Sequence, residues 1–211
     1  MTSELTSATQ RAERLGPVRR RPLILDAALR LLVSEDSAAV SMDAIAAAAG
    51  VTKPVVYSCF PSKTELWRAL IEREEQRMLA HVGGALPEQP NLDDPEAGLR
   101  SGLAAFLSAV AAEPDSWRLI YLAERGAVPE IRRRVVRGRE LQLEALRGLT
   151  TAQYAARGER DAERKGELLA GTIVATAEMA ARLVLEAPER WSPQELAEML
   201  ARLVVRGAMR T

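Results

Sequence analysis

The sequence contains little cysteine, histidine or aromatic residue, and each shortage excludes a class of protein. Cys59 is the only cysteine, so no intrachain disulfide can form and nothing indicates an oxidising compartment. His81 is the only histidine, and no Glu precedes it by three or four residues, so a helical Glu-x-x-His metal site is absent. Only 8 of the 211 residues are aromatic, whereas helix-forming Ala, Leu, Arg and Glu are abundant. We therefore expect an all-α, cytoplasmic protein without a metal.

The sequence also lacks a net charge and a long uninterrupted apolar run. Its 29 Lys and Arg balance its 29 Asp and Glu, which excludes a bulk polycation, and 47% apolar residues argue against disorder. The longest apolar stretch, 168–185, is interrupted by Glu178 and Arg182, whereas a membrane span needs about 20 apolar residues. No basic segment followed by an apolar one opens the chain. The sequence predicts neither a membrane span nor a secretory leader.

Signatures of catalysis are missing as well. The chain has no Gly-rich phosphate loop, no Gly-x-Ser-x-Gly motif and no cysteine cluster. We therefore expect neither an enzyme nor a bound cofactor.

What the sequence does contain is a series of short helices near its start. Apolar residues recur at helical spacing from Arg21 onward, and Ser41 supplies an N-cap for a second helix that Gly50 ends. Thr52 caps a third helix, and residues 62–65 form a capping box that opens a fourth. Four helices are thus predicted within about sixty residues.

Breaker residues divide the rest of the chain. The predicted organisation is a flexible basic arm over 1–19, a helical domain over 20–82, a linker over 83–95 and a second helical domain over 96–211. The helices expected in the second domain cover 96–112, 115–125, 130–156, 162–186 and 193–208.

The second and third short helices form a helix-turn-helix pattern. In this pattern the second helix enters the DNA major groove while the first crosses the backbone. Lys53 can reach a phosphate or a guanine edge, Tyr57 can donate to a phosphate, and the apolar Pro54 and Val55 can contact thymine methyl groups. Residues 11–63 hold eight Lys or Arg against five Asp or Glu, so positive charge concentrates where DNA would lie.

The run from Ser41 to Leu66 resembles the DNA-binding segment of the TetR-type transcriptional regulators. The matching elements are the opening hydroxyl residue, Ile-Ala, Ala-Gly-Val-Thr, a Tyr followed three residues later by Phe, and a Lys ahead of Leu. The resemblance implies phosphate contacts for Ser41, Thr52, Tyr57 and Lys63. It places Lys53, Pro54 and Val55 nearest the bases and implies arm contacts for Arg20 and Arg21. Ser58 is also expected to face outward. Cys59 departs from the family pattern, which usually has His or Tyr there, and a buried small hydrophobe is the simplest interpretation.

The same resemblance implies a C-terminal domain that binds a ligand and forms a homodimer. The residues expected to line a ligand pocket are Phe106, Val110, Trp117, Ile120, Tyr121, Glu178, Met179 and Leu183. Most would be core residues in any case, and an ion pair between Glu178 and Arg182 competes with a ligand contact. The residues expected at a dimer interface are Val174, Ala181, Leu185, Leu196, Leu200 and Leu203, although periodicity alone fits the protomer core equally well.

The function that these features predict is sequence-specific binding of double-stranded DNA at a pseudo-palindromic operator. We expect a repressor that a small apolar or amphipathic ligand releases. Two alternatives stay open: a dimeric DNA-binding protein that needs no ligand, and a helical adaptor that does not bind DNA.

Overall fold

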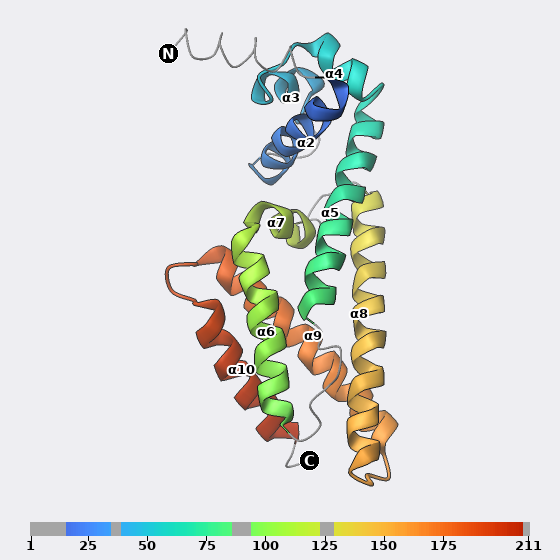
Figure 1. The fold of residues 1–211 in the computed structure, drawn as a ribbon, viewed down its shortest axis with the longest axis vertical. Coiled ribbons are helices and arrows are strands. Elements are labelled where there is room, and N and C mark those ends of the chain that lie inside the picture. The colour runs from blue at the N-terminus through green and yellow to red at the C-terminus, as the bar shows by residue number, and fades with distance from the viewer. Residues whose placement is uncertain (1–15, 35–38, 86–93, 123–128, 209–211) are drawn as a thin grey trace. The chain divides into compact units, whose positions relative to one another are not determined.

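The computed structural model describes residues 16–34, 39–85, 94–122 and 129–208, and Figure 1 shows their arrangement into helices. Throughout these residues the regular structure is α-helix and no strand occurs, which confirms the all-α prediction. The helices, labelled as in Figure 1, are α2 (Pro17–Ser34), α3 (Met42–Ala48), α4 (Lys53–Cys59), α5 (Lys63–Ala85), α6 (Pro95–Ala112), α7 (Pro114–Leu122), α8 (Pro129–Ala156), α9 (Ala162–Glu186) and α10 (Pro193–Ala208).

Helix boundaries follow the capping residues of the sequence. The amide of Glu65 donates to the Ser62 hydroxyl over 3.1 Å at the start of α5. Ser192 and Pro193 open α10 at the predicted residue, and α9 also has its predicted bounds. These starts were predictable because capping depends on side chains within three residues of one another.

The first helix is longer than expected. It begins at Pro17, so Arg19 and Arg20 lie in α2, although the predicted arm extended to residue 19. Arg19 is exposed, and two arginines in the first turn of α2 leave too few apolar residues there for a helical periodicity to be detected. Residues 1–15 of the predicted arm lie outside the described residues.

The chain divides into two compact units that do not follow sequence order. One comprises the described parts of residues 1–77 together with 115–132, and the other comprises 78–114 and 133–211. The predicted boundary at 83–95 therefore differs from the boundary within α5, and α7 joins the N-terminal unit. The sequence could not show this, because a contiguous domain is the simplest interpretation of a breaker-rich segment.

The N-terminal unit is built on a small apolar core. Helices α2, α3 and α4 contact one another in all three pairs. The largest fully buried side chains of this core are Ile24, Val40, Ile45, Val56, Phe60, Leu66 and Leu70.

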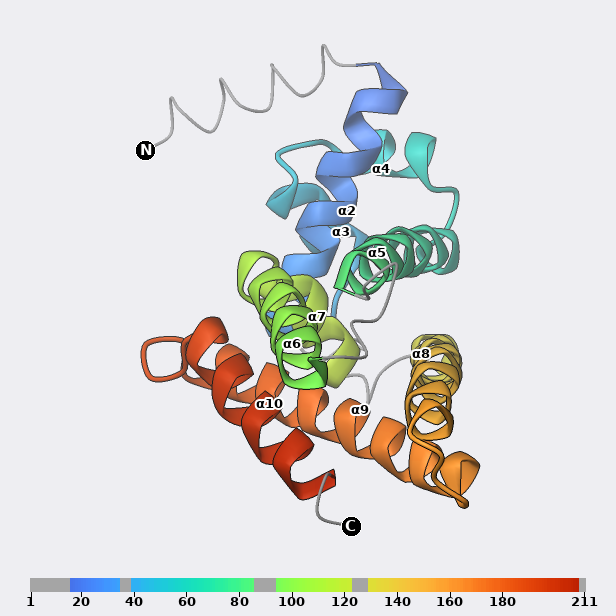
Figure 2. The same cartoon turned by 60° about the horizontal axis from the view of Figure 1, so that its bottom comes forward.

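The C-terminal unit is centred on α6, α9 and α10, which pack together (Figure 2). Leu107 and Val110 of α6 and Leu196 of α10 are fully or almost fully buried. The α8–α9 pair is close as well, since the Thr150 hydroxyl donates to the carbonyl oxygen of Gly166 over 2.7 Å. A side chain on Gly166 would meet the backbone of Thr151, so glycine is required there.

One helix among the described residues, α9, is long and apolar enough by length and composition to cross a membrane. The two charges at 178 and 182 therefore do not exclude a span on composition, contrary to the sequence argument. A single such helix is weak evidence, because the core helix of a soluble protein has the same profile. The packing of α9 against α6 and α10 accounts for part of its apolar character, since 33% of its apolar stretch is buried.

Candidate nucleic-acid interface

The turn between α3 and α4 has a defined hydrogen-bonding geometry. Gly50 has a φ of 64°, its amide donates to Ala47 over 3.1 Å, and the amide of Val51 donates to Ala46 over 3.0 Å. This is a Schellman C-cap, in which glycine avoids the steric cost of a left-handed residue. The buried side chain of Val51 anchors the far side of the turn. The turn therefore holds the two helices in one arrangement.

Helix α4 has one buried face and one exposed face. Val56 and Cys59 are buried, and Val55 is half-buried. The exposed side chains are Thr52, Lys53, Pro54, Tyr57 and Ser58, all predicted to face outward. The structure thus brings the predicted DNA-facing residues of α4 together on one surface, with Tyr57 one turn after Lys53.

The hydroxyl groups around α4 differ in what they already bind. The Ser41 oxygen accepts from the amide of Ala44 over 3.1 Å and caps α3. Thr52 occupies the N-cap position of α4, yet its side chain forms no capping hydrogen bond. The Ser58 hydroxyl donates to the carbonyl of Val55 over 2.8 Å, which engages its only proton. Ser58 can therefore offer DNA an acceptor but not a further donor.

Lys53, the first residue of α4, forms an ion pair with α3. Its Nζ lies 2.9 Å from Oδ2 of Asp43, and the two side chains are 52% and 64% exposed. The hydrogen bond and charge of Asp43 raise the pKa of Lys53, to which the nearby Tyr57 adds a smaller effect. The sequence carries no signal for the role of Asp43, because an ion pair across a turn has no fixed spacing.

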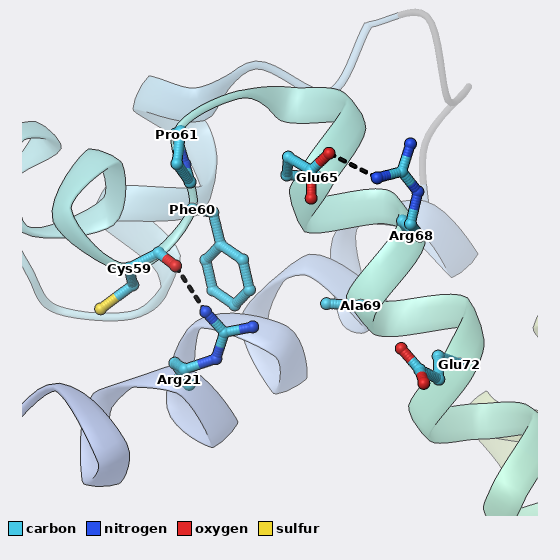
Figure 3. Close-up of a pocket in the computed structure, with 8 residues that line it drawn as sticks. All are labelled: Arg21, Cys59, Phe60, Pro61, Glu65, Arg68, Ala69 and Glu72. Atoms are coloured by element: carbon cyan, nitrogen blue, oxygen red, sulfur yellow. Dashed lines mark hydrogen bonds and ion pairs between the residues drawn. The ribbon is translucent and has the colours of Figure 1, made fainter.

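Arg21 has a structural role that the predicted arm contact does not describe. Its guanidinium donates to the carbonyl oxygen of Cys59 over 2.6 Å and lies 4.3 Å from the centre of the Phe60 ring (Figure 3). Arg21 therefore binds the C-terminal end of α4, where unpaired helix carbonyls attract a cation. Arg20, the other predicted arm residue, is half-buried in the same helix.

A small cavity of about 150 Å³ adjoins this contact (Figure 3). It is lined by Arg21, Cys59, Phe60, Pro61, Glu65, Arg68, Ala69 and Glu72. The Cys59 side chain is buried, in agreement with its interpretation as a small hydrophobe. Burial keeps Cys59 from a phosphate contact at this position.

Lys63 is the first residue of α5. Its side chain is half-buried, and Nζ lies 5.8 Å from the centre of the Trp67 ring. As the first residue of a helix it stands at the positive end of the helix dipole, where an anion is favoured.

The residues predicted to line a ligand pocket are only partly together. Val110 of α6 is fully buried, Phe106 of α6 and Leu183 of α9 are half-buried, and Met179 of α9 is exposed. Trp117 is buried but belongs to the N-terminal unit. The side chains of Ile120 and Tyr121 lie outside the described residues.

Glu178 has a partner that the sequence did not indicate. Its carboxylate lies 3.0 Å from Nε of Arg139 on α8, in addition to any contact with the Arg182 expected at i+4. Glu178 therefore contributes to the α8–α9 contact.

Most residues predicted at a dimer interface lie in the core of the protomer instead. Five of the six are buried, namely Val174, Ala181, Leu185, Leu196 and Leu200. Leu203 alone of the six is exposed, at 70%. The reason is that α6 covers the apolar stripes of α9 and α10, which periodicity in one helix cannot reveal.

Two family models match the chain. The model for bacterial regulatory proteins of the tetR family covers residues 24–70, and the model for tetracyclin repressor-like C-terminal domains covers 95–207, more than half of the chain. The chain belongs to the TetR family of bacterial regulatory proteins. This membership confirms the resemblance seen in the sequence and agrees with the predicted class, a transcription regulator.

Individual relatives agree with the family. The transcriptional activator FasR of Mycolicibacterium smegmatis is 33% identical over 122 residues, which cover 58% of this chain and 54% of that protein. The regulator EthR of the same species is 31% identical over 99 residues, or 47% of this chain and 45% of that one. The chain thus matches about half the length of these curated relatives. A solved TetR-like transcriptional regulator from Rhodococcus sp. RHA1 is 29% identical with a TM-score of 0.67, covering 94% of this chain and all of that one.

Proposed function

We propose that this protein is a transcription regulator that binds a specific operator in double-stranded DNA through α4. The observation that carries the proposal is the division of α4 into a buried apolar face and an exposed face with Thr52, Lys53, Pro54 and Tyr57. A helix with such an exposed face fits the major groove, which is about 12 Å wide. Since DNA is its partner, the protein acts in the cytoplasm.

Each exposed group has a task in this proposal. Lys53 and the apolar side chains of Pro54 and Val55 contact base edges. The hydroxyls of Ser41, Thr52 and Tyr57 and the ammonium of Lys63 contact phosphates and set the register of α4 in the groove. Arg20 adds a cation from α2.

Selection of binding sites from random duplexes tests the proposal. We expect enrichment of a pseudo-palindrome whose half-sites lie about 34–36 Å apart, or a multiple of that distance. The matched control carries Lys53→Ala and Tyr57→Ala, two changes on the exposed face of α4 that leave the core intact, and it should enrich no site. Failure of the wild-type protein to enrich any duplex would contradict DNA recognition and favour a helical adaptor.

We further propose a homodimer formed by the outer faces of α9 and α10. Its support is a set of large apolar side chains that remain exposed on these two helices in the protomer: Leu168, Met199 and Leu203. A symmetric dimer would present two copies of α4 to DNA, which doubles the short contact that one copy can make and accounts for a palindromic site.

Ligand control is the third part of the proposal. A small apolar or amphipathic molecule binds among α6 and α9, near Phe106, Val110, Met179 and Leu183, and releases the operator, so that the protein acts as a repressor. Two of these side chains are half-buried and one is exposed, and they leave apolar surface for a ligand to cover.

Titration with the amphipathic fluorophore anilinonaphthalene sulfonate tests ligand control. Thermodynamic linkage requires that the operator weaken fluorophore binding by the factor by which the fluorophore weakens operator binding, and a hundredfold effect corresponds to about 2.7 kcal/mol. Equal fluorophore affinity with and without the operator would favour the alternative, a dimeric DNA-binding protein that needs no ligand. An operator-driven reporter, active without the protein and silent with it, tests repression.

A further inference from the structure

The ion pair between Lys53 and Asp43 lies on the surface that we propose for DNA. Asp43 stands in the first turn of α3 and Lys53 at the first position of α4, so the pair spans the turn between the two helices. Their charged atoms are 2.9 Å apart, and more than half of each side chain is exposed. A carboxylate on this surface is unexpected, because phosphate oxygens repel it.

The pair changes what Lys53 offers to a duplex. An ammonium group has three donors, and Asp43 takes one, so two remain for other acceptors. Since the carboxylate also cancels the ammonium charge, the pair as a whole attracts a distant phosphate weakly. Lys53 keeps its proton in the pair, because the hydrogen bond and charge of Asp43 raise its pKa. The ion pair thus fixes the position of the ammonium group without deprotonating it.

We propose that Asp43 is a specificity-determining residue, which withholds Lys53 from the phosphates of arbitrary DNA and directs its two remaining donors to base acceptors of the operator. This inference rests on the proposed DNA-binding function. The two acceptors that guanine presents in the major groove, O6 and N7, match the two donors that remain on Lys53.

The substitution Asp43→Asn tests the inference, measured against the selected operator and a scrambled duplex of equal length and composition. The variant keeps the size of the side chain but releases Lys53 to the phosphates. We expect affinity for the scrambled duplex to rise about two- to fivefold, because exposed ion pairs are weak. The salt dependence of this binding should steepen by about 0.9, the slope of one added phosphate contact. The ratio of operator to scrambled affinity should fall.

Two controls separate this effect from general changes of charge and fold. Glu144→Gln removes an exposed carboxylate on α8, also paired with an arginine, so it changes net charge equally and should leave both affinities unchanged. In a Lys53→Ala background, Asp43→Asn should no longer alter binding of the scrambled duplex. Thermal unfolding checks that each variant is folded.

Several outcomes would overturn the inference. An unchanged affinity ratio in Asp43→Asn would do so, as would an undiminished effect of Asp43→Asn in the Lys53→Ala background, since Asp43 would then act on DNA directly. Either result leaves the proposed function standing when the wild-type protein still selects an operator. A wild-type protein that binds no duplex would overturn both.

Discussion

The guanidinium of Arg21 on α2 donates a hydrogen bond to the carbonyl oxygen of Cys59, the last residue of α4, over 2.6 Å. The same group stacks on Phe60, which follows α4 and is buried. This contact joins two residues, one in α2 and one in α4, that are 38 positions apart in sequence. It makes Arg21 a positioning residue for α4, the helix that we propose to face DNA.

Replacement of Arg21 should therefore lower stability and leave the salt dependence of DNA binding unchanged. We expect Arg21→Ala to lower the free energy of unfolding by about 1 to 2 kcal/mol, because a hydrogen bond from a charged group and a ring contact are both lost. Thermal unfolding measures the loss, with the exposed Arg19→Ala as the control that should not shift. A salt slope flatter by about 0.9 would show instead that Arg21 contacts a phosphate.

Replacement of Lys63 should, in contrast to that of Arg21, change the salt dependence of DNA binding. In Lys63→Ala we expect weaker binding to every duplex and a salt slope flatter by about 0.9, because one phosphate contact is removed. Fluorescence anisotropy over a range of salt concentrations gives both values. Lys165→Ala in α9, where the lysine pairs with Glu159, should leave the slope as it is. A slope unaltered in Lys63→Ala would exclude this residue from the interface.

Leu200 and Leu203 of α10 should respond differently to replacement by glutamate. Leu203 is exposed, so we expect Leu203→Glu to separate the proposed dimer into folded monomers, since the charge would lie unpaired in the proposed interface. Leu200 is buried in the protomer, so Leu200→Glu should unfold it. Light scattering and circular dichroism distinguish these results. Leu141→Glu on α8 is the exposed control, and a dimer that survives Leu203→Glu would place the interface elsewhere.

Replacing each of two glycines of α9 by alanine should change the free energy of unfolding in opposite directions. A Cβ on Gly166 would lie 2.6 Å from the amide nitrogen of Thr151, so Gly166→Ala should destabilise the protein by about 1 to 3 kcal/mol through overpacking. Gly171 has no atom within 4 Å of the corresponding position, and Gly171→Ala should stabilise it by about 0.5 to 1 kcal/mol. Thermal unfolding of both variants measures these two changes in stability. Equal shifts would contradict the close α8–α9 contact.

The pKa of Lys53 should depend on Asp43. Because the hydrogen bond and charge of Asp43 raise this pKa in the folded state, the stability from the pair is complete below the ordinary lysine pKa of about 10.4. It disappears as the pH rises through the higher pKa of the folded protein. NMR titration of the lysine side chains should show the Lys53 pKa falling toward its ordinary value in Asp43→Asn. An unchanged pKa in that variant would mean that the pair does not persist in solution.

Local sequence signals were sufficient for the elements and for the outward face of α4. Ser41, Gly50 and Ser62 marked helix boundaries, because a cap or a left-handed turn depends on neighbours within a few residues. The alternation of buried and exposed residues in α4 followed from helical periodicity, so the exposure of Lys53 and Tyr57 was predictable from the sequence. The family motif itself lies within 26 consecutive residues, 41–66.

Tertiary structure alone decided which groups meet across helices. The DNA contact expected for Arg21 stays a prediction, and the fold adds a contact of its guanidinium with the end of α4. The packing of α3 and α4 brings Asp43 to Lys53, which the sequence does not indicate. In the sequence, the apolar stripes on α9 and α10 are equally compatible with a dimer interface and with a protomer core. In the fold, α6 packs against both helices and covers these stripes. The physical reason is that amphipathicity requires a helix face to be buried but does not specify by which partner, and long charged side chains choose among several partners of similar energy.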